Sequence, residues 1–114
     1  MDPEWLIIIK DRKDAGDKHT TRVSAHLAGM RADPKDRWVF AGYNVVQHVQ
    51  DRKNATLTGR VLVGRASSKE VLEARIKSDA FVTEGVWDPE TLVITPFVST
   101  FRQPLLPGGA PPAP

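Results

Sequence analysis

The chain has 114 residues, of which 40% are hydrophobic and 26% charged, and these values are typical of one globular domain. The net charge of +2 is small and the basic residues are interspersed with acidic ones, so we expect no nucleic-acid partner. The chain has no cysteine, which excludes a disulfide framework, thiol catalysis and cysteine-ligated metal centres.

The first element in chain order is an apolar run from Trp5 to Ile9. The run is too short for a membrane span or a core helix, and its β-branched residues predict a strand that is covered on both faces of its sheet. Acidic residues precede it where a signal peptide would have a basic leader. We therefore expect a soluble cytoplasmic protein with no membrane association.

A helix is predicted next, after a charged loop over residues 11–18. Thr20 or Thr21 is expected as its N-cap, and Asp33-Pro34 ends it after Ala32. The residues of its buried stripe follow the i, i+3, i+4, i+7 spacing of an amphipathic helix: Val23, His26, Leu27 and Met30. His26 is the polar member of this otherwise apolar stripe.

Three more strands and a second helix follow. The strands are expected over residues 38–46, interrupted by Gly42, over residues 56–63, and over residues 91–97. A capping box, Ser67-x-x-Glu70, is expected to open a helix that ends near Ser78. This helix should turn three apolar residues inward: Val71, Leu72 and Ile76. Residues 79–89 are expected to connect it to the last strand.

The resulting order, βαββαβ, predicts an α+β ferredoxin-like fold with an antiparallel sheet and both helices on one face. We expect the domain to cover residues 1–102 and residues 103–114 to form a proline-rich flexible tail. The first strand is apolar on both faces, but the helices cover only one. A second copy of the chain is the most economical cover for the other face, so we expect a homodimer.

The residue most indicative of function is His26. A lone histidine on a helix is often structural, and a catalytic role requires a partner that orients the ring. Asp79, at the expected C-terminal end of the second helix, is the candidate partner, although the helix dipole disfavours an anion there. If the two side chains meet, they form a general acid/base dyad.

The other histidines, His19 and His48, fall in polar segments and are expected at the surface. They and His26 lack the spacing of a zinc site, so we expect no metal. No glycine-rich phosphate loop is expected either, because Gly108-Gly109 lies in the tail with no helix after it. Four aromatic residues are candidates for the walls of an apolar pocket, with the hydrophobic core as the alternative location: Phe40, Tyr43, Phe81 and Trp87.

Four segments resemble motifs of the YCII-like (YciI-related) family, in the same order and with similar spacing. The segments are Arg22-Val-Ser-Ala-His26-Leu27, Phe40-Ala41-Gly42, residues 78–87 (Ser-Asp-Ala-Phe-Val-Thr-Glu-Gly-Val-Trp) and Val93-Ile-Thr-Pro96-Phe97. The chain departs from the family pattern after the aspartate, where Ala80 replaces a proline. Phe81 and Trp87 also replace two tyrosines, which makes the expected pocket more apolar.

The resemblance implies a ferredoxin-like fold of the dimeric α/β barrel type and an active site at His26 and Asp79. One relative dehydrochlorinates a chlorinated hydroxyhydroquinone, which implies lyase chemistry without a metal or redox cofactor. We therefore hypothesise a lyase or isomerase that acts on a small phenolic or enolisable molecule. Arg22, one turn before His26, is either a group that steadies a developing enolate or a surface residue. The alternative is a non-catalytic dimeric module that binds a small molecule.

Overall fold

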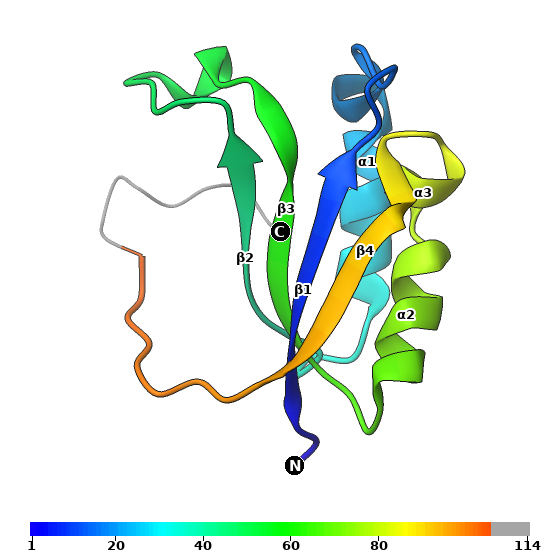
Figure 1. The fold of residues 1–114 in the computed structure, drawn as a ribbon, viewed down its shortest axis with the longest axis vertical. Coiled ribbons are helices and arrows are strands. Elements are labelled where there is room, and N and C mark those ends of the chain that lie inside the picture. Colours follow the sequence, from blue (N-terminus) through cyan, green and yellow to red (C-terminus); the bar gives the residue numbers. More distant parts are fainter. Residues whose placement is uncertain (106–114) are drawn as a thin grey trace.

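Four strands form one antiparallel sheet in the order β2-β3-β1-β4, and the helices lie along one of its faces (Figure 1). The computed structural model describes residues 1–105, without the side chain of Arg52. The elements in chain order are β1 (Glu4–Asp11), α1 (Lys18–Ala32), β2 (Trp38–Val45), a 3₁₀ turn η1 (Arg52–Asn54), β3 (Leu57–Arg65), α2 (Lys69–Lys77), α3 (Ala80–Thr83) and β4 (Trp87–Phe97). The predicted α+β class and βαββαβ order are confirmed, with α3 as an added turn.

The core lies between the sheet and the helices. Ile7 and Ile9 of β1 point to this side, and Ile7 pairs with Leu62 of β3 and with Ile94 of β4. These side chains pack against fully buried residues of α2, α3 and the segment after α3: Leu72, Ile76, Phe81, Val86 and Trp87. Gly59 permits the close approach of β1 and β3, because a Cβ atom there would lie 2.5 Å from the carbonyl oxygen of Ile9.

The opposite face of the sheet is also apolar. Leu6 and Ile8 of β1 point to it, and in the strand register Ile8 lies beside Val61 and Val93. Phe40 lies on this face across from Val63, and the exposed fractions of Phe40 and Val93 are 46% and 53%. The description of the first strand as apolar on both faces is therefore correct.

Several expected boundaries were wrong. The helix α1 begins at Lys18, two residues before Thr20, and its N-cap is Asp17. The chain turns into the helix just before this point, at Gly16, whose φ is 58°. Ser68 occupies the N-cap of α2 in place of Ser67. Val71 is 39% exposed and does not face the core.

β1, β3 and β4 also extend beyond their expected ranges, whereas β2 ends one residue earlier than expected. Gly42 pairs with Val61 and does not interrupt β2. β4 begins at Trp87, which pairs with Asp11, and it includes Pro89. An edge strand tolerates proline because one side of its backbone has no ladder to complete. No helix of the described residues is long and apolar enough to cross a membrane.

The tail lies largely outside the described residues. Residues 98–105 follow β4 without helix or strand, and residues 106–114 are beyond the part of the chain that the structure describes. Ser99 and Arg102 hold the start of this segment to the domain through hydrogen bonds to the Glu4 carboxylate. The domain boundary at residue 102 and the flexible tail remain predictions.

Candidate active site

His26 and Asp79 meet in the interior, although 53 residues separate them in sequence. His26 Nδ1 and Asp79 Oδ2 are 2.7 Å apart, and the side chains are 0% and 1% exposed. The apolar stripe of α1 turns His26 toward the core, while Asp79 stands at the junction of α2 and α3. The expected meeting of the two side chains is therefore seen in the structure.

Asp79 is the N-cap of α3, where the exposed backbone N–H groups favour an anion. Asp79 directly follows Ser78, the C-cap of α2, so its expected place at the C-terminal end of that helix is confirmed. The N-terminal turn of α3 offsets the unfavourable dipole of α2 there. Asp79 Oδ2 accepts a hydrogen bond from the Phe81 backbone N–H at 2.9 Å. A new helix turn therefore helps to hold the carboxylate against His26.

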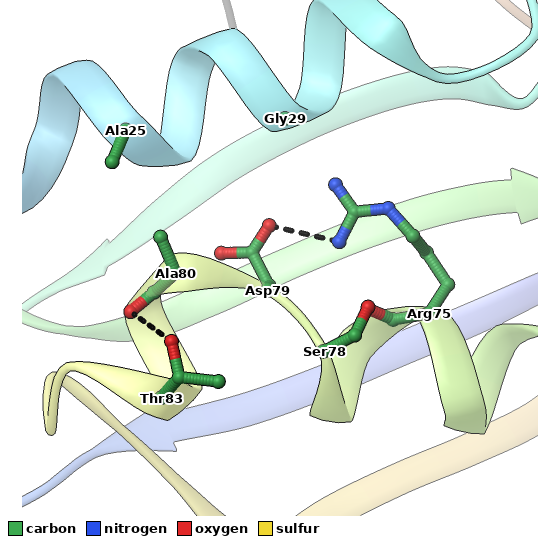
Figure 2. Close-up of a pocket in the computed structure, with 7 residues that line it drawn as sticks. All are labelled: Ala25, Gly29, Arg75, Ser78, Asp79, Ala80 and Thr83. Atoms are coloured by element: carbon green, nitrogen blue, oxygen red, sulfur yellow. Dashed lines mark hydrogen bonds and ion pairs between the residues drawn. The ribbon is translucent and has the colours of Figure 1, made fainter.

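Arg75 holds the other oxygen of Asp79. Its Nη1 donates to Asp79 Oδ1 at 2.9 Å, and its Nε donates to the Asp33 carboxylate at 2.8 Å. Figure 2 shows the Arg75–Asp79 contact beside α1. Burial acts to raise the pKa of Asp79, but the hydrogen bonds from His26, Phe81 and Arg75 outweigh it and lower the pKa below its ordinary value.

Arg60 of β3 contacts the other ring nitrogen of His26. Its Nη1 lies 3.2 Å from His26 Nε2, and the Arg60 residue is 2% exposed. A guanidinium only donates hydrogen bonds, so Nε2 accepts here and Nδ1 bears the ring hydrogen that is donated to Asp79. The two contacts fix both the tautomer and the orientation of the imidazole.

Aromatic rings surround the imidazole. Phe81 stacks on His26 with ring centroids 4.0 Å apart and planes inclined by 9°. Trp87 meets His26 edge-on at 5.1 Å and Phe81 at 5.3 Å. These contacts exclude water from the imidazole, which is 0% exposed, so its hydrogen bonds act in a medium of low dielectric constant.

A surface groove of about 380 Å³ borders the opposite side of the dyad (Figure 2). It lies between α1 and the α2–α3 junction and is lined by Ala25, Gly29, Arg75, Ser78, Asp79, Ala80 and Thr83. Gly29 borders the groove beside Asp79, and a Cβ atom there would be in ordinary van der Waals contact with Arg75 Nη2 at 3.5 Å and Asp79 Oδ1 at 4.0 Å. The groove reaches Asp79, whereas His26 does not line it.

This chain is similar to proteins that are named for biosynthesis in Gibberella and Emericella. It is 32% identical over 97 residues to the fusaric acid biosynthesis protein 2 of Gibberella fujikuroi, which covers 84% of this chain and 93% of the relative. This chain therefore belongs to the family of the fusaric acid biosynthesis protein 2. It is also 28% identical to the aspercryptin biosynthesis cluster protein B of Emericella nidulans, covering 88% of this chain but only 65% of the relative.

The fold has a counterpart among solved structures. The 5-chloro-2-hydroxyhydroquinone dehydrochlorinase of Burkholderia phenoliruptrix, solved with 2,5-dihydroxybenzoquinone, superposes with a TM-score of 0.72. The match covers 85% of this chain and 95% of the dehydrochlorinase at 20% identity, and it shows a common fold. No family model matches the chain, so the YCII-like assignment remains a prediction.

The remaining predicted site residues divide between the dyad and other places in the fold. Phe81 and Trp87 pack on His26, and the Tyr43 ring lies over the Arg60 guanidinium at 4.2 Å. Phe40 lies on the other face of the sheet and does not share a pocket with them. Arg22 is exposed and pairs with Glu84 at 3.3 Å, away from His26.

His19 was expected at the surface but belongs to this cluster. It lies in the first turn of α1, with its ring 5.5 Å from that of Tyr43 and 4.8 Å from that of Phe81. Burial, followed by the nearby Arg60 and His26, lowers its pKa.

His48 is exposed, as expected. Among residues 1–105, no three histidine, aspartate or glutamate side chains form a group able to hold a metal ion.

Arg60 and His19 were missed for different reasons. Arg60 lies two residues before Leu62 in β3, so the two side chains point to the same face of the sheet. Leu62 is buried, and the two-residue spacing could have indicated that Arg60 points inward as well. His19 was missed because the start of α1 was placed after it. With the helix beginning at Lys18, His19 lies seven residues before His26, on the same side of the helix.

Proposed function

We propose that this chain is a cofactor-free tailoring enzyme that performs general acid/base chemistry on a small phenolic or enolisable molecule. The observation that supports it most is the buried His26–Asp79 contact, with the tautomer fixed by Arg60. The names of the relatives support a place in secondary metabolism. The dehydrochlorinase of the same fold supports elimination on a hydroxylated ring and, with the motif resemblance, YCII-like membership.

In this mechanism His26 Nε2 is the base. A substrate O–H, or a C–H next to a carbonyl, replaces Arg60 Nη1 as its partner and gives up a proton. Nδ1–H remains bonded to Asp79, so the carboxylate stabilises the imidazolium that forms. Arg75 and the Phe81 N–H keep Asp79 anionic during this step. Catalysis of this type accelerates a reaction by about 10²–10⁴-fold.

The reaction class follows from the fate of the electron pair. In a lyase, the electron pair of the broken C–H bond forms a new C=C bond, and the bond from carbon to the leaving group breaks. A halide leaves with the electron pair of that bond, and the proton stays on His26. If water is expelled, the imidazolium returns its proton to the leaving oxygen. In an isomerase, the proton is delivered to another carbon of the same molecule. We favour the lyase, with the isomerase as its variant.

A binding module without catalysis is the second candidate. It is favoured by the 0% exposure of His26, whose two nitrogens both have protein partners. A fully paired, stacked histidine is also what a purely structural network would contain. The two functions differ in one measurable property, because only the enzyme needs a basic nitrogen at residue 26.

We also propose that the chain forms a homodimer through its open sheet face. The side chains there are apolar and include the half-exposed Phe40 and Val93. Apolar side chains gathered on one exposed sheet face are typical of a protein–protein contact. A second copy fits because the same face on both partners is self-complementary under twofold symmetry.

Replacement of His26 with Gln tests the proposed base. A panel of hydroxylated quinones, chlorinated hydroquinones and 1,3-dicarbonyl compounds is incubated with protein in D₂O. Elimination is followed by chloride release and enolisation by deuterium uptake. We expect at least about a 100-fold loss of the wild-type rate, because glutamine fills the space but does not take up a proton.

The matched control is His48→Gln, which changes an exposed histidine and should retain the wild-type rate. Folding of both variants is verified by circular dichroism and thermal unfolding. A folded His26→Gln protein with an undiminished rate would remove His26 from the mechanism. A wild-type protein that binds panel members but exchanges no proton supports the binding module instead.

A further inference from the structure

Arg60 is a buried cation whose charge no carboxylate neutralises directly. It is 2% exposed, and within the described residues no carboxylate oxygen lies within 4.0 Å of its guanidinium. Its nearest partners are the neutral His26 Nε2 and the face of the Tyr43 ring. Asp79 and Asp11 act on it only from longer range, and burial lowers its pKa. A buried charge without a close counter-ion is costly, so it indicates a need other than folding stability.

Two buried nitrogens of the same cluster have no hydrogen-bond partner among the described residues. They are Arg60 Nε and His19 Nε2. Both side chains contact Tyr43, Arg60 through its guanidinium and His19 through its ring. Buried polar atoms are nearly always paired in native proteins, so two such atoms in one cluster indicate a site for a polar ligand atom.

We propose that Arg60 and His19 bind a phenolate or enolate oxygen of the substrate. Arg60 Nε–H donates to this oxygen and supplies the positive charge, while His19, as its Nε2–H tautomer, donates the second hydrogen bond. This subsite rests on the proposed function, because Arg60 Nη1 already touches the nitrogen of His26 that would take the proton. The same guanidinium would then hold the oxygen on which negative charge develops.

The surrounding side chains favour a flat, conjugated ligand over a compact inorganic anion. Phe81 presents its ring to both His19 and His26, and Tyr43 presents its ring to Arg60 and His19. Aromatic rings stack on planar π systems and offer little to a tetrahedral ion. The ligand class is therefore a hydroxylated aromatic or quinonoid molecule with one ionised oxygen.

Tyr43 separates this subsite from solvent. It is 37% exposed and belongs to β2, which is an edge strand of the sheet. Its ring lies directly on the otherwise buried Arg60. We infer that the ligand enters on the Tyr43 side, because this partly exposed ring covers the guanidinium, whereas Arg60 does not line the groove beside Asp79.

The test measures binding of 2,5-dihydroxybenzoquinone by calorimetry. Its matched control is 2,5-dimethoxybenzoquinone, which has the same ring and no ionisable hydroxyl group. We expect the wild-type protein to bind the hydroxylated probe at least about 10-fold more tightly, which is the effect of one charge-assisted hydrogen bond. Arg60→Met and His19→Phe should each weaken its binding by about 10-fold or more, while affinity for the dimethoxy probe stays unchanged.

These variants separate binding from folding. Arg60→Met removes a buried charge, which is stabilising, but leaves His26 Nε2 without a donor, which is destabilising, so its thermal midpoint should stay near that of the wild type. If Arg60→Met does not fold, Arg60→Lys keeps the charge without an Nε–H, and a loss of about 10-fold in affinity is again expected. His19→Phe keeps the ring packed against Tyr43 and Phe81.

Several results would overturn the subsite. They are wild-type protein without saturable binding, equal affinity for the two probes, or Arg60 and His19 variants that bind as the wild type does. Turnover of the substrate panel distinguishes this proposal from the proposed function. If the probe binds in this way but no panel compound is turned over, the subsite stands and the enzymatic proposal fails.

Discussion

His26 is held from both sides by groups of opposite charge. Asp79 accepts its Nδ1–H, and Arg60 donates to its Nε2. Arg75 extends the hydrogen-bond network, because it donates to both Asp79 and Asp33. A single imidazole is thus fixed by a network that crosses α1, α2 and β3, and its neutral Nδ1–H form fits both contacts.

Asp79→Asn should destabilise the protein by an amount that depends on pH. At pH 7 we expect a loss of about 2–3 kcal/mol in the free energy of unfolding, because the buried charged hydrogen bonds are weakened. The pKa of Asp79 is lowered from its ordinary value of 3.8, so the ionised carboxylate stabilises the fold above that value. This contribution is lost as the pH falls through the folded-state pKa.

The measurement is urea unfolding of wild type and Asp79→Asn at a series of pH values from 7 down to 3. The difference in unfolding free energy should be constant near neutrality and shrink below about pH 4, as the wild-type carboxyl group takes up a proton. Asp88→Asn, at a partly exposed aspartate of β4, is the control and should show no such trend. A constant difference down to pH 3 would contradict the assignment.

At the residue scale, the sequence predicted the dyad better than its surroundings. The apolar neighbours of His26 in its helix, and the position of Asp79 in the family-like segment 78–87, were sufficient to predict that the two side chains meet. Arg60 was not predicted, because an arginine in a strand is normally solvated and only its alternation with Leu62 placed it inside. Phe40 and Tyr43 lie three residues apart in β2, and this odd separation puts their side chains on opposite faces.

At the scale of elements, the short helix α3 positions the site. It spans Ala80–Thr83, its N-cap Asp79 binds His26, and its buried Phe81 stacks on the same ring. The turn closes when the Val86 N–H donates to the Phe81 carbonyl at 2.8 Å. Gly85 makes this possible because its φ of 84° lies in the left-handed region.

Gly85→Ala should therefore lower the free energy of unfolding by about 1–2 kcal/mol, which is the cost of a left-handed residue with a Cβ atom. The comparison is Gly42→Ala in β2, where φ is not positive and a Cβ atom would meet nothing within 4 Å. That control should change stability by less than about 0.5 kcal/mol. Chemical denaturation of the three proteins measures both values, and equal effects would show that Gly85 is not under this constraint.

The order and type of the main elements were predictable, whereas their ends depended on tertiary contacts. β4 extends back to Trp87 because pairing with β1 resumes at Asp88 and Trp87 after a register shift that includes Pro89, which sequence pattern alone marks as a break. α3 was missed because four residues are too few for a visible periodicity. The site lies at these ends, which explains why its geometry was harder to predict than the fold.

At the scale of the whole molecule, the helices and the sheet form two layers, and no helix of residues 1–105 covers the other face of the sheet (Figure 1). Burial follows from this arrangement: Ile7 is 0% exposed on the helix side, whereas Val93 is 53% exposed on the open side. The His26 cluster lies on the helix side of the sheet, so pairing of two copies through the open face leaves Arg60 and Tyr43 outside the interface core.

Val93→Lys tests the proposed dimer. A lysine at this position places a charge among apolar side chains of both partners, and its desolvation should raise the dimer dissociation constant by about 100-fold or more. The control is Val71→Lys on α2, where a valine that is 39% exposed lies on the helix layer, away from the open face. Light scattering on a sizing column should show a dimer for the wild type and Val71→Lys, and a monomer for Val93→Lys at micromolar concentration.

A monomeric wild type, or a Val93→Lys protein that remains dimeric, would show that the open face does not pair two copies. Probe binding at Arg60 should be retained in the Val93→Lys monomer, because the subsite and the open face lie on opposite sides of the sheet.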